Sequence, residues 1–171
     1  MNKFGMSAAK IKVLSIFIIV ALVSADQIIK YFVDAYLKPV GSVPVIDKIL
    51  QLSYYENDGA MMGMMSGKTL TMTVLAVICL AVIAFVIFSG KVKFGIDYWC
   101  IVFMMSGGLG NIIDRIFRGY VIDYIEILFV DFYIFNFADC LVTCAAFAMI
   151  GNQIYEIYKE HKKKKVKAID G

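Results

Sequence analysis

Carboxylate and amide side chains gather near the ends of the apolar stretches in this 171-residue chain. Two carboxylic acids in a poorly hydrated site cannot both ionise readily, so one of them keeps its proton. Such a pair can act as a general base toward a water molecule and as a general acid toward a leaving amine. The residues that could perform or support this chemistry are Asp26, Gln27, Lys30, Asn57, Asn111, Asp114, Arg115, Asp123, Asn136 and Asp139.

Other catalytic and metal-binding arrangements have little support in the sequence. The single histidine, His161, lies in the lysine-rich C-terminal segment, which excludes a histidine-based triad. The usual zinc ligands are missing, and the four cysteines lie inside apolar stretches, where they are expected as small buried hydrophobes. A carboxylate-bound magnesium ion stays as an alternative, although the phosphotransferase motif D-x-x-D-G-x-x-A-R is absent. We expect no metal and no cofactor.

Each polar residue taken alone has an ordinary structural explanation. Asp26 and Lys30 are four residues apart, the spacing of an ion pair on one helical face. Asp114 and Arg115 could form a charge cluster at the membrane interface. Several acids and amides at one depth are harder to explain by packing, because a carboxylate at mid-bilayer costs about 2.5 to 3.5 kcal/mol. The grouping therefore favours a functional site.

The composition indicates an integral membrane protein. Hydrophobic residues make up 61% of the chain and charged residues 18%. The run from Thr69 to Phe88 contains no charged residue. About 20 apolar residues in a helix span the hydrocarbon core of a bilayer.

The apolar pattern predicts an all-α membrane protein with one integral membrane domain, residues 1–171. The segment 34–66 holds both prolines and alternating apolar residues, which predicts a small extracytoplasmic β segment. The segment 115–135 is also expected outside the membrane, and its aromatic part, about 124–135, as an interfacial helix. A basic tail, 159–171, follows the last span. The predicted transmembrane helices are about 13–33, 69–88, 96–113 and 136–158.

The N-terminal segment has features of a secretory signal peptide. A basic start precedes an apolar stretch, and Val23-Ser24-Ala25 could be a cleavage site. The apolar pattern resumes beyond Asp26, so we expect the segment to stay in place as the first transmembrane helix.

The charge distribution predicts the orientation in the membrane. Four spans put both termini on one side, and that side carries 11 of the 17 basic residues, which places it in the cytoplasm. The lysine-rich tail is expected beside anionic lipids and not at a nucleic acid. The polar side chains of the helices then meet near the outer interface. The 11 lysines are Lys3, Lys10, Lys12, Lys91, Lys93, Lys159, Lys162, Lys163, Lys164, Lys165 and Lys167.

Five short motifs, in order, carry a resemblance along almost the whole chain. The sequence resembles the signal peptidase II family (prolipoprotein signal peptidases), which are intramembrane aspartyl proteases. Two departures concern the lipid-contact surface: methionines at 61, 62 and 64 replace a usual aromatic, and Tyr124 stands for a phenylalanine. The motifs are Asp26-Gln27-Ile28-Ile29-Lys30, Asn57-Asp58-Gly59-Ala60, Gly107 to Arg115, Gly119 to Tyr124, and Phe135 to Asp139.

The resemblance implies a catalytic dyad of Asp123 and Asp139. It implies an aspartic endopeptidase that cleaves the signal peptide from diacylglyceryl-modified prolipoproteins, on the N-terminal side of the lipidated cysteine. We expect a monomeric, multi-pass protein of the bacterial cytoplasmic membrane, with lipid-modified precursors and membrane lipids as partners. By resemblance, the substrate-binding residues are Asn57, Gly59, Asn111, Arg115 and Asn136, and the supporting residues are Asp26, Lys30 and Asp114.

Two functions of other classes stay open. A carboxylate-lined transporter or proton-coupled channel would also carry acids within membrane helices. A lipid-binding scaffold without catalytic activity would tolerate the loss of both carboxylates. Among the glycines, Gly107 is expected to allow close approach of two helices, and Gly108 could do so or leave room for a substrate backbone.

Overall fold

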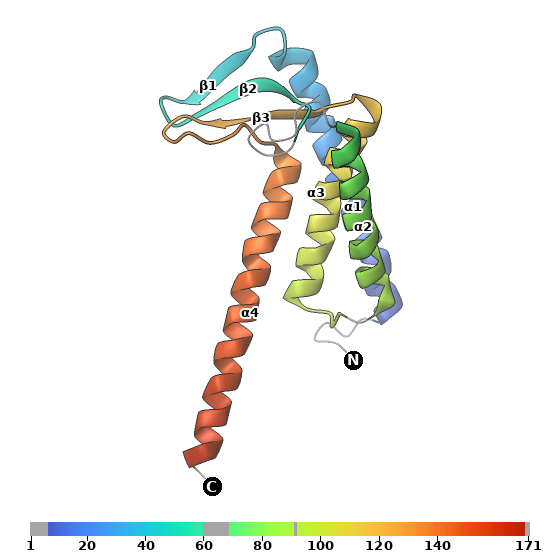
Figure 1. Cartoon of the computed structure of the whole chain (residues 1–171), viewed down its shortest axis with the longest axis vertical. Helices are drawn as coiled ribbons and strands as arrows, with labels where there is room; N and C mark the ends of the chain where they lie inside the picture. Colours follow the sequence, from blue (N-terminus) through green and yellow to red (C-terminus); the bar gives the residue numbers. More distant parts are fainter. Residues whose placement is uncertain (1–6, 60–68, 91, 170–171) are drawn as a thin grey trace.

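A computed structural model describes residues 7–59, 69–90 and 92–169. Four helices in this part are long and apolar enough to cross a membrane. Helix α1 continues directly into a π-helical segment, η1, and a three-stranded sheet lies at one end of the helices (Figure 1). The elements are α1 (Ala8–Phe32), η1 (Val33–Leu37), β1 (Ser42–Ile46), β2 (Leu50–Asn57), α2 (Thr69–Ser89), α3 (Ile96–Phe117), β3 (Val121–Ile127) and α4 (Phe137–Ile169).

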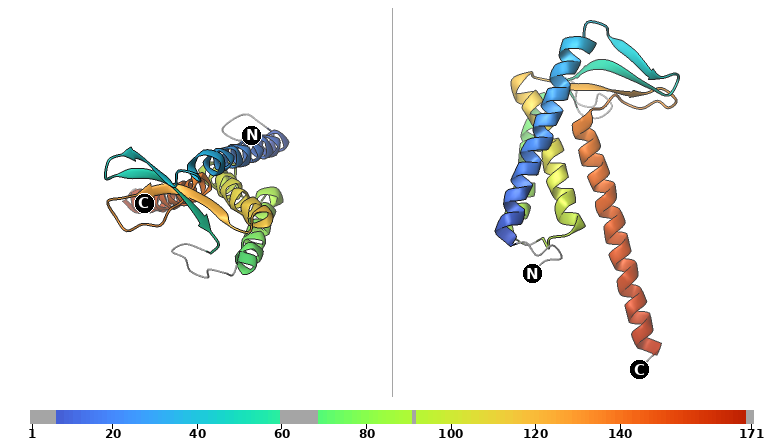
Figure 2. Two further views of the ribbon diagram at one scale, coloured as in Figure 1. Left: turned by 90° about the horizontal axis from the view of Figure 1, so that it is seen from above. Right: turned by 180° about the vertical axis from the view of Figure 1, so that it is seen from behind.

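Helix α3 packs against each of the other three helices (Figure 2). The cluster between α1, α2 and α3 contains Ile11, Ile87, Tyr98 and Val102, all almost fully buried. Helix α4 packs on α3 near the sheet and then diverges from the bundle toward its C-terminus (Figure 1). Large apolar side chains on the outside of the helices remain exposed, as expected where lipid tails surround them.

Glycines on α3 allow α1, α2 and α4 to approach its backbone. A Cβ atom on Gly107 would lie 2.3 Å from the backbone oxygen of Ala138 on α4, so Gly107 permits the close approach expected from the sequence. A Cβ atom on Gly108 would lie 2.6 Å from Leu80 of α2, which gives this glycine a packing role as well.

The sheet order is β1-β2-β3, with antiparallel neighbours. Its register pairs Asn57 with Val121 and Tyr55 with Asp123. Ile122 and Tyr124 of β3 pack on Val33 of η1. The sheet is therefore anchored to the C-terminal end of α1 through η1.

The predicted fold class is confirmed: four membrane-spanning helices accompany a small sheet. The interfacial helix expected at about 124–135 was wrong, because β3 occupies Val121–Ile127 and the residues after it form turns and a bridge to Ile125. Pairing with β2 satisfies the backbone of this segment, and packing on η1 buries its apolar side chains.

Several helices are longer than expected. Helix α3 ends at Phe117, so Arg115 lies on a helix and not in the following loop. Helix α4 continues to Ile169, so most of the predicted basic tail is helical. The methionines at 61, 62 and 64 lie outside the described residues.

The close approach at Gly107 leads to a test. Gly107→Ala should destabilise the protein by about 1 to 3 kcal/mol, because the added methyl group meets a backbone oxygen that cannot turn aside. Gly151→Ala on α4 is the control, since a Cβ atom there meets nothing within 4 Å. Thermal unfolding in detergent would measure both. Equal stability of the two variants would contradict this description of the α3–α4 contact.

Candidate active site

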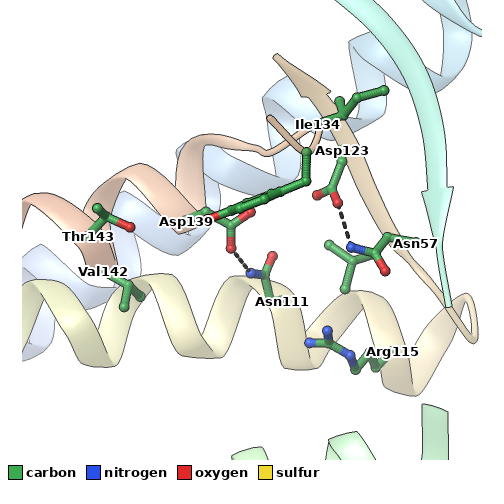
Figure 3. Close-up of a pocket in the computed structure, with 10 residues that line it drawn as sticks. Asn57, Asn111, Arg115, Asp123, Ile134, Asp139, Val142 and Thr143 are labelled. Carbon is green, nitrogen blue, oxygen red and sulfur yellow. Dashed lines mark hydrogen bonds between the residues drawn. The ribbon is translucent and has the colours of Figure 1, made fainter. Parts of the chain in front are cut away.

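Asp123 and Asp139 line the same pocket, a cavity of about 250 Å³ between β3, α3 and α4 (Figure 3). Asp123 lies on β3, and Asp139 lies in the first turn of α4. Asp123 is 2% exposed, whereas Asp139 is less deeply covered. The lining residues are Asn57, Asn111, Arg115, Val121, Asp123, Tyr133, Ile134, Asp139, Val142 and Thr143.

The chain after β3 returns to that strand and thereby brings Asn136 beside Asp123. The backbone of Phe135 pairs with Ile125, with N–O distances of 2.8 and 3.1 Å. The hydroxyl of Tyr124 accepts a hydrogen bond from the backbone N–H of Phe137 at 3.2 Å. Tyr124, which departs from the family's phenylalanine, thus satisfies one free N–H at the start of α4.

Asn136 caps α4 and also contacts the other acid. Its Oδ1 accepts from the Asp139 backbone N–H at 3.0 Å, and the Asp139 carboxylate accepts from the Asn136 backbone N–H at 3.1 Å. This reciprocal pair has the form of a capping box. The Asn136 side-chain amide donates to Asp123 Oδ1 at 2.5 Å. One asparagine therefore positions both members of the acidic pair.

Two further amides contact the carboxylates. Asn57 at the end of β2 donates to Asp123 Oδ2 at 2.8 Å, and its own oxygen accepts from the Gly59 backbone N–H at 3.0 Å. Asn111 on α3 donates to Asp139 Oδ1 at 2.8 Å. Both oxygens of Asp123 and both oxygens of Asp139 thus accept a hydrogen bond.

The surroundings raise the pKa of Asp123 to about 7. Burial is the largest cause, because it disfavours the charged form, and the nearby charge of Asp139 acts in the same direction. The hydrogen bonds from Asn57 and Asn136 lower the pKa but only partly offset the burial. Asp123 can therefore hold a proton near neutral pH.

Arg115 brings a positive group to the wall of the pocket. Its guanidinium donates to the Gly59 backbone oxygen at 3.1 Å, which ties α3 to the segment after β2. Its Nε is buried and has no hydrogen-bond partner among the described residues. A planar guanidinium with a free donor suits a carbonyl or carboxylate ligand.

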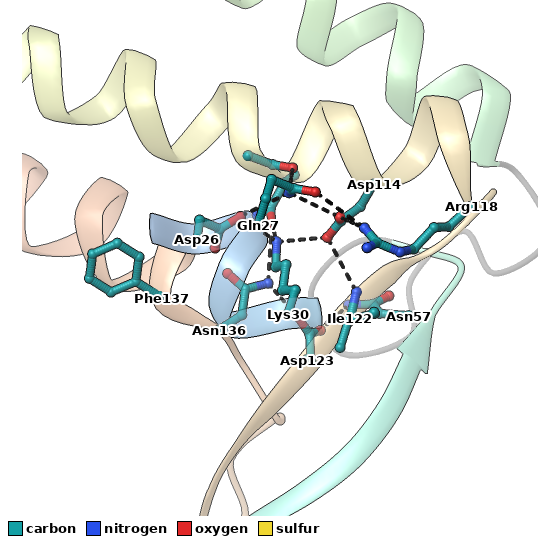
Figure 4. A network of polar contacts seen from close by, with 12 residues as sticks. Asp26, Gln27, Lys30, Asn57, Asp114, Arg118, Ile122, Asp123, Asn136 and Phe137 are labelled. Atoms are coloured by element: carbon teal, nitrogen blue, oxygen red, sulfur yellow. Dashed lines mark hydrogen bonds and ion pairs between the residues drawn. The ribbon is translucent and has the colours of Figure 1, made fainter. Parts of the chain in front are cut away.

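A buried cluster of charges lies behind the pocket (Figure 4). The ammonium of Lys30 lies 3.0 Å from Asp26 and 2.7 Å from Asp114, and all three side chains are at most 1% exposed. Arg118 forms an ion pair with Asp114. Gln27 donates to Asp26 and Asp114 at 3.2 and 3.1 Å.

Lys30 also connects this cluster to the pocket. Its ammonium donates to Asn111 Oδ1 at 2.9 Å, and Asn136 donates to the same oxygen at 3.2 Å. With its oxygen held by two donors, Asn111 must turn its NH₂ group toward Asp139. Asp26, Lys30 and Asp114 thus lie outside the pocket lining and contact it through Asn111.

Three of the residues expected to bind substrate belong to the pocket lining, namely Asn57, Asn111 and Arg115. Asn136 is not part of the lining but contacts both acids. Gly59 contributes backbone groups to Asn57 and Arg115.

The sequence interpretation missed five lining residues: Val121, Tyr133, Ile134, Val142 and Thr143. Val142 and Thr143 follow Asp139 by three and four residues, so helical periodicity could have identified them. Tyr133 and Ile134 depend on the return of the loop to β3, which has no local signal.

Comparison with known proteins identifies the same family that the sequence motifs resemble. The family model described as "Signal peptidase (SPase) II" matches residues 18–155. A lipoprotein signal peptidase of Fusobacterium nucleatum is 34% identical over 154 residues, covering 89% of this chain and 90% of that protein. One of Caldanaerobacter subterraneus is 35% identical over 136 residues, covering 78% of this chain and 90% of that protein.

A solved bacterial membrane enzyme has a similar fold. It superposes with a TM-score of 0.74 and 32% sequence identity, over 84% of this chain and 89% of that chain.

The Lys30 cluster leads to a second test. Lys30→Met would leave Asp26 and Asp114 buried without their shared cation, so we expect a loss of about 3 to 5 kcal/mol of stability. Lys38→Met is the matched control, because Lys38 pairs with Asp34 and Glu56 at the surface, where water screens the ion pairs, and its loss should change the stability little. Unfolding of both variants in the same detergent gives the comparison, and a stable Lys30→Met protein would refute the role of the cluster.

Proposed function

The chain belongs to the signal peptidase II family, as its motifs suggested, and from this premise we propose that it removes signal peptides from lipid-modified precursor proteins by an aspartyl mechanism. The relatives named lipoprotein signal peptidase support the substrate class. The observation that carries the mechanism is one pocket in which Asp123 and Asp139 both accept amide hydrogen bonds. The proposed cleavage position is the bond on the N-terminal side of the lipidated cysteine.

In this proposal the two acids share one proton and act on a water molecule between them. Asp139 lies at the N-terminus of α4, where the helix dipole favours a negative charge. Asp123 is buried, with its pKa raised to about 7. We therefore assign the proton to Asp123 and the charge to Asp139 before the reaction begins.

The reaction then proceeds by general acid–base catalysis. Asp139 takes a proton from water as the oxygen attacks the scissile carbonyl carbon, and Asp123 donates its proton to the carbonyl oxygen. The tetrahedral intermediate breaks as the amine of the lipidated cysteine takes a proton from Asp139. The amine leaves, and Asp123 regains a proton from the collapsing intermediate, which restores the initial state.

Substrate would be held by the remaining polar groups of the pocket. The free Nε of Arg115 suits a backbone carbonyl of the precursor. The signal helix would enter laterally from the membrane, at an apolar groove between α3 and α4 that Phe103, Leu141 and Cys144 help to line. One chain supplies every polar group used here, so we propose that it works as a monomer.

The proposed orientation puts the active site at the outer face of the bacterial cytoplasmic membrane. The N-terminal end of α1 and the C-terminal end of α4 both lie away from the sheet (Figure 2). The lysines at 159 and 162–165 lie at the same end of α4, and cytoplasmic segments are enriched in such residues. The sheet and the pocket would then face the compartment where precursors arrive.

Replacement of either dyad residue tests the mechanism. Asp123→Asn and Asp139→Asn keep the shape of the side chain but remove the titrating group, so cleavage of a lipidated precursor peptide should fall by about a thousandfold or more. Asp131→Asn changes an exposed acid outside the pocket and should cleave at the wild-type rate. Normal cleavage by both dyad variants would exclude the aspartyl mechanism.

The pH profile tests the assignment of the proton. Because the pKa of Asp123 is raised to about 7, this acid loses its proton as the pH rises through that value, and kcat/KM should decline there. Asn57→Ala removes a hydrogen bond that lowers this pKa, so the alkaline limb should move to higher pH.

The control for this profile is Gln51→Ala. Gln51 donates to Glu126 on the same sheet at 2.6 Å, away from the pocket, and its loss should leave the alkaline limb in place. A profile that stays flat through neutral pH in the wild type would rule out the assignment.

A further inference from the structure

Thr143 places a hydroxyl group in the pocket, one helical turn from Asp139 toward the middle of the membrane (Figure 3). Residues four apart share one face of a helix, with Cβ atoms about 5 to 6 Å apart. Thr143 is exposed on α4, and Val142 lies beside it in the lining. Thr143 therefore adds a hydroxyl group to a part of the pocket where its neighbour in the lining, Val142, is apolar.

The Thr143 hydroxyl differs in its bonding from the hydroxyls of three other residues on the membrane helices. Those of Ser15, Thr73 and Ser106 donate to the backbone carbonyl four residues earlier, at 2.8, 2.8 and 2.9 Å. Thr143 makes no such bond to Asp139 and has no polar partner within the described residues. Its hydroxyl is therefore available to donate to an acceptor that a ligand brings into the pocket.

The proposed function supplies a substrate group at the matching place. The lipidated cysteine carries a diacylglyceryl group on its sulfur, and its ester carbonyls are hydrogen-bond acceptors. A short chain of single bonds joins the scissile amide to the nearer ester, long enough to cover one helical turn of about 5.4 Å. With the scissile bond at Asp139 and the lipid pointing into the membrane, an ester carbonyl reaches the depth of Thr143.

We propose that Thr143 is a specificity-determining residue that donates a hydrogen bond to an ester carbonyl of the substrate's lipid group. This inference rests on the proposed function. The contact favours lipidated over unmodified precursors, because an unmodified cysteine brings no acceptor to this depth. The apolar Val142 beside it suits the acyl chain that follows the ester.

A comparison of two lipids on one precursor peptide tests the contact. One peptide carries the diester lipid, and the other carries the diether analogue, which has the same chains but no carbonyl. Thr143→Val should lower kcat/KM for the diester peptide about fivefold, the size expected for one neutral hydrogen bond. Its kcat/KM for the diether peptide should equal that of the wild type. Thr143→Ser keeps the hydroxyl and should retain the preference for the diester.

Thr71→Val is the matched control, because Thr71 is an exposed threonine on α2 outside the pocket lining. It should leave both peptides unaffected. A Thr143→Val protein that cleaves the diester peptide like the wild type, or loses equal activity on both peptides, would overturn the inference while the proposed function stands. A wild-type protein that fails to cleave the diester peptide would overturn both.

Discussion

A lysine ammonium group buried in the last turn of α1 holds α1 to α3 next to the pocket. Lys30 contacts two carboxylates and one amide, and its side chain is fully buried. Charges in such a place are unfavourable unless they are paired and hydrogen-bonded, so the cluster tolerates few alternative arrangements. That constraint extends to the candidate active site, because the Asn111 amide that Lys30 contacts also donates to Asp139.

Asn136 links the start of α4 to the geometry of the acidic pair. The same side chain caps α4 and contacts Asp123, so the start of the helix and the geometry of the acidic pair are set together. Asn57 adds a contact from the end of β2, where the sheet register brings it near Asp123. The sheet therefore holds Asp123, which lies on a strand, close to Asp139, which lies on a membrane helix.

The position of the pocket suits a reaction that joins water to a lipid-anchored substrate. The acids lie where the outer sheet meets the helices, and the lining continues along α4 through Val142 and Thr143. In the proposed orientation, water reaches the acids from the outer side and apolar substrate groups reach them from the membrane. The raised pKa of Asp123 follows from the same placement, since partial burial keeps a carboxylic acid protonated near neutral pH.

The membrane class and the four spans could be predicted from the sequence alone, and the sequence also supplied the residues proposed for acid–base chemistry. These follow from local quantities: apolar length, charge placement and short motifs such as Asn57 to Gly59. Only the tertiary structure shows that residues 121–127 form a strand, that Lys30 orients Asn111, and that Tyr133 and Ile134 join the pocket. Those features depend on pairing between residues distant in the chain, which no local pattern encodes.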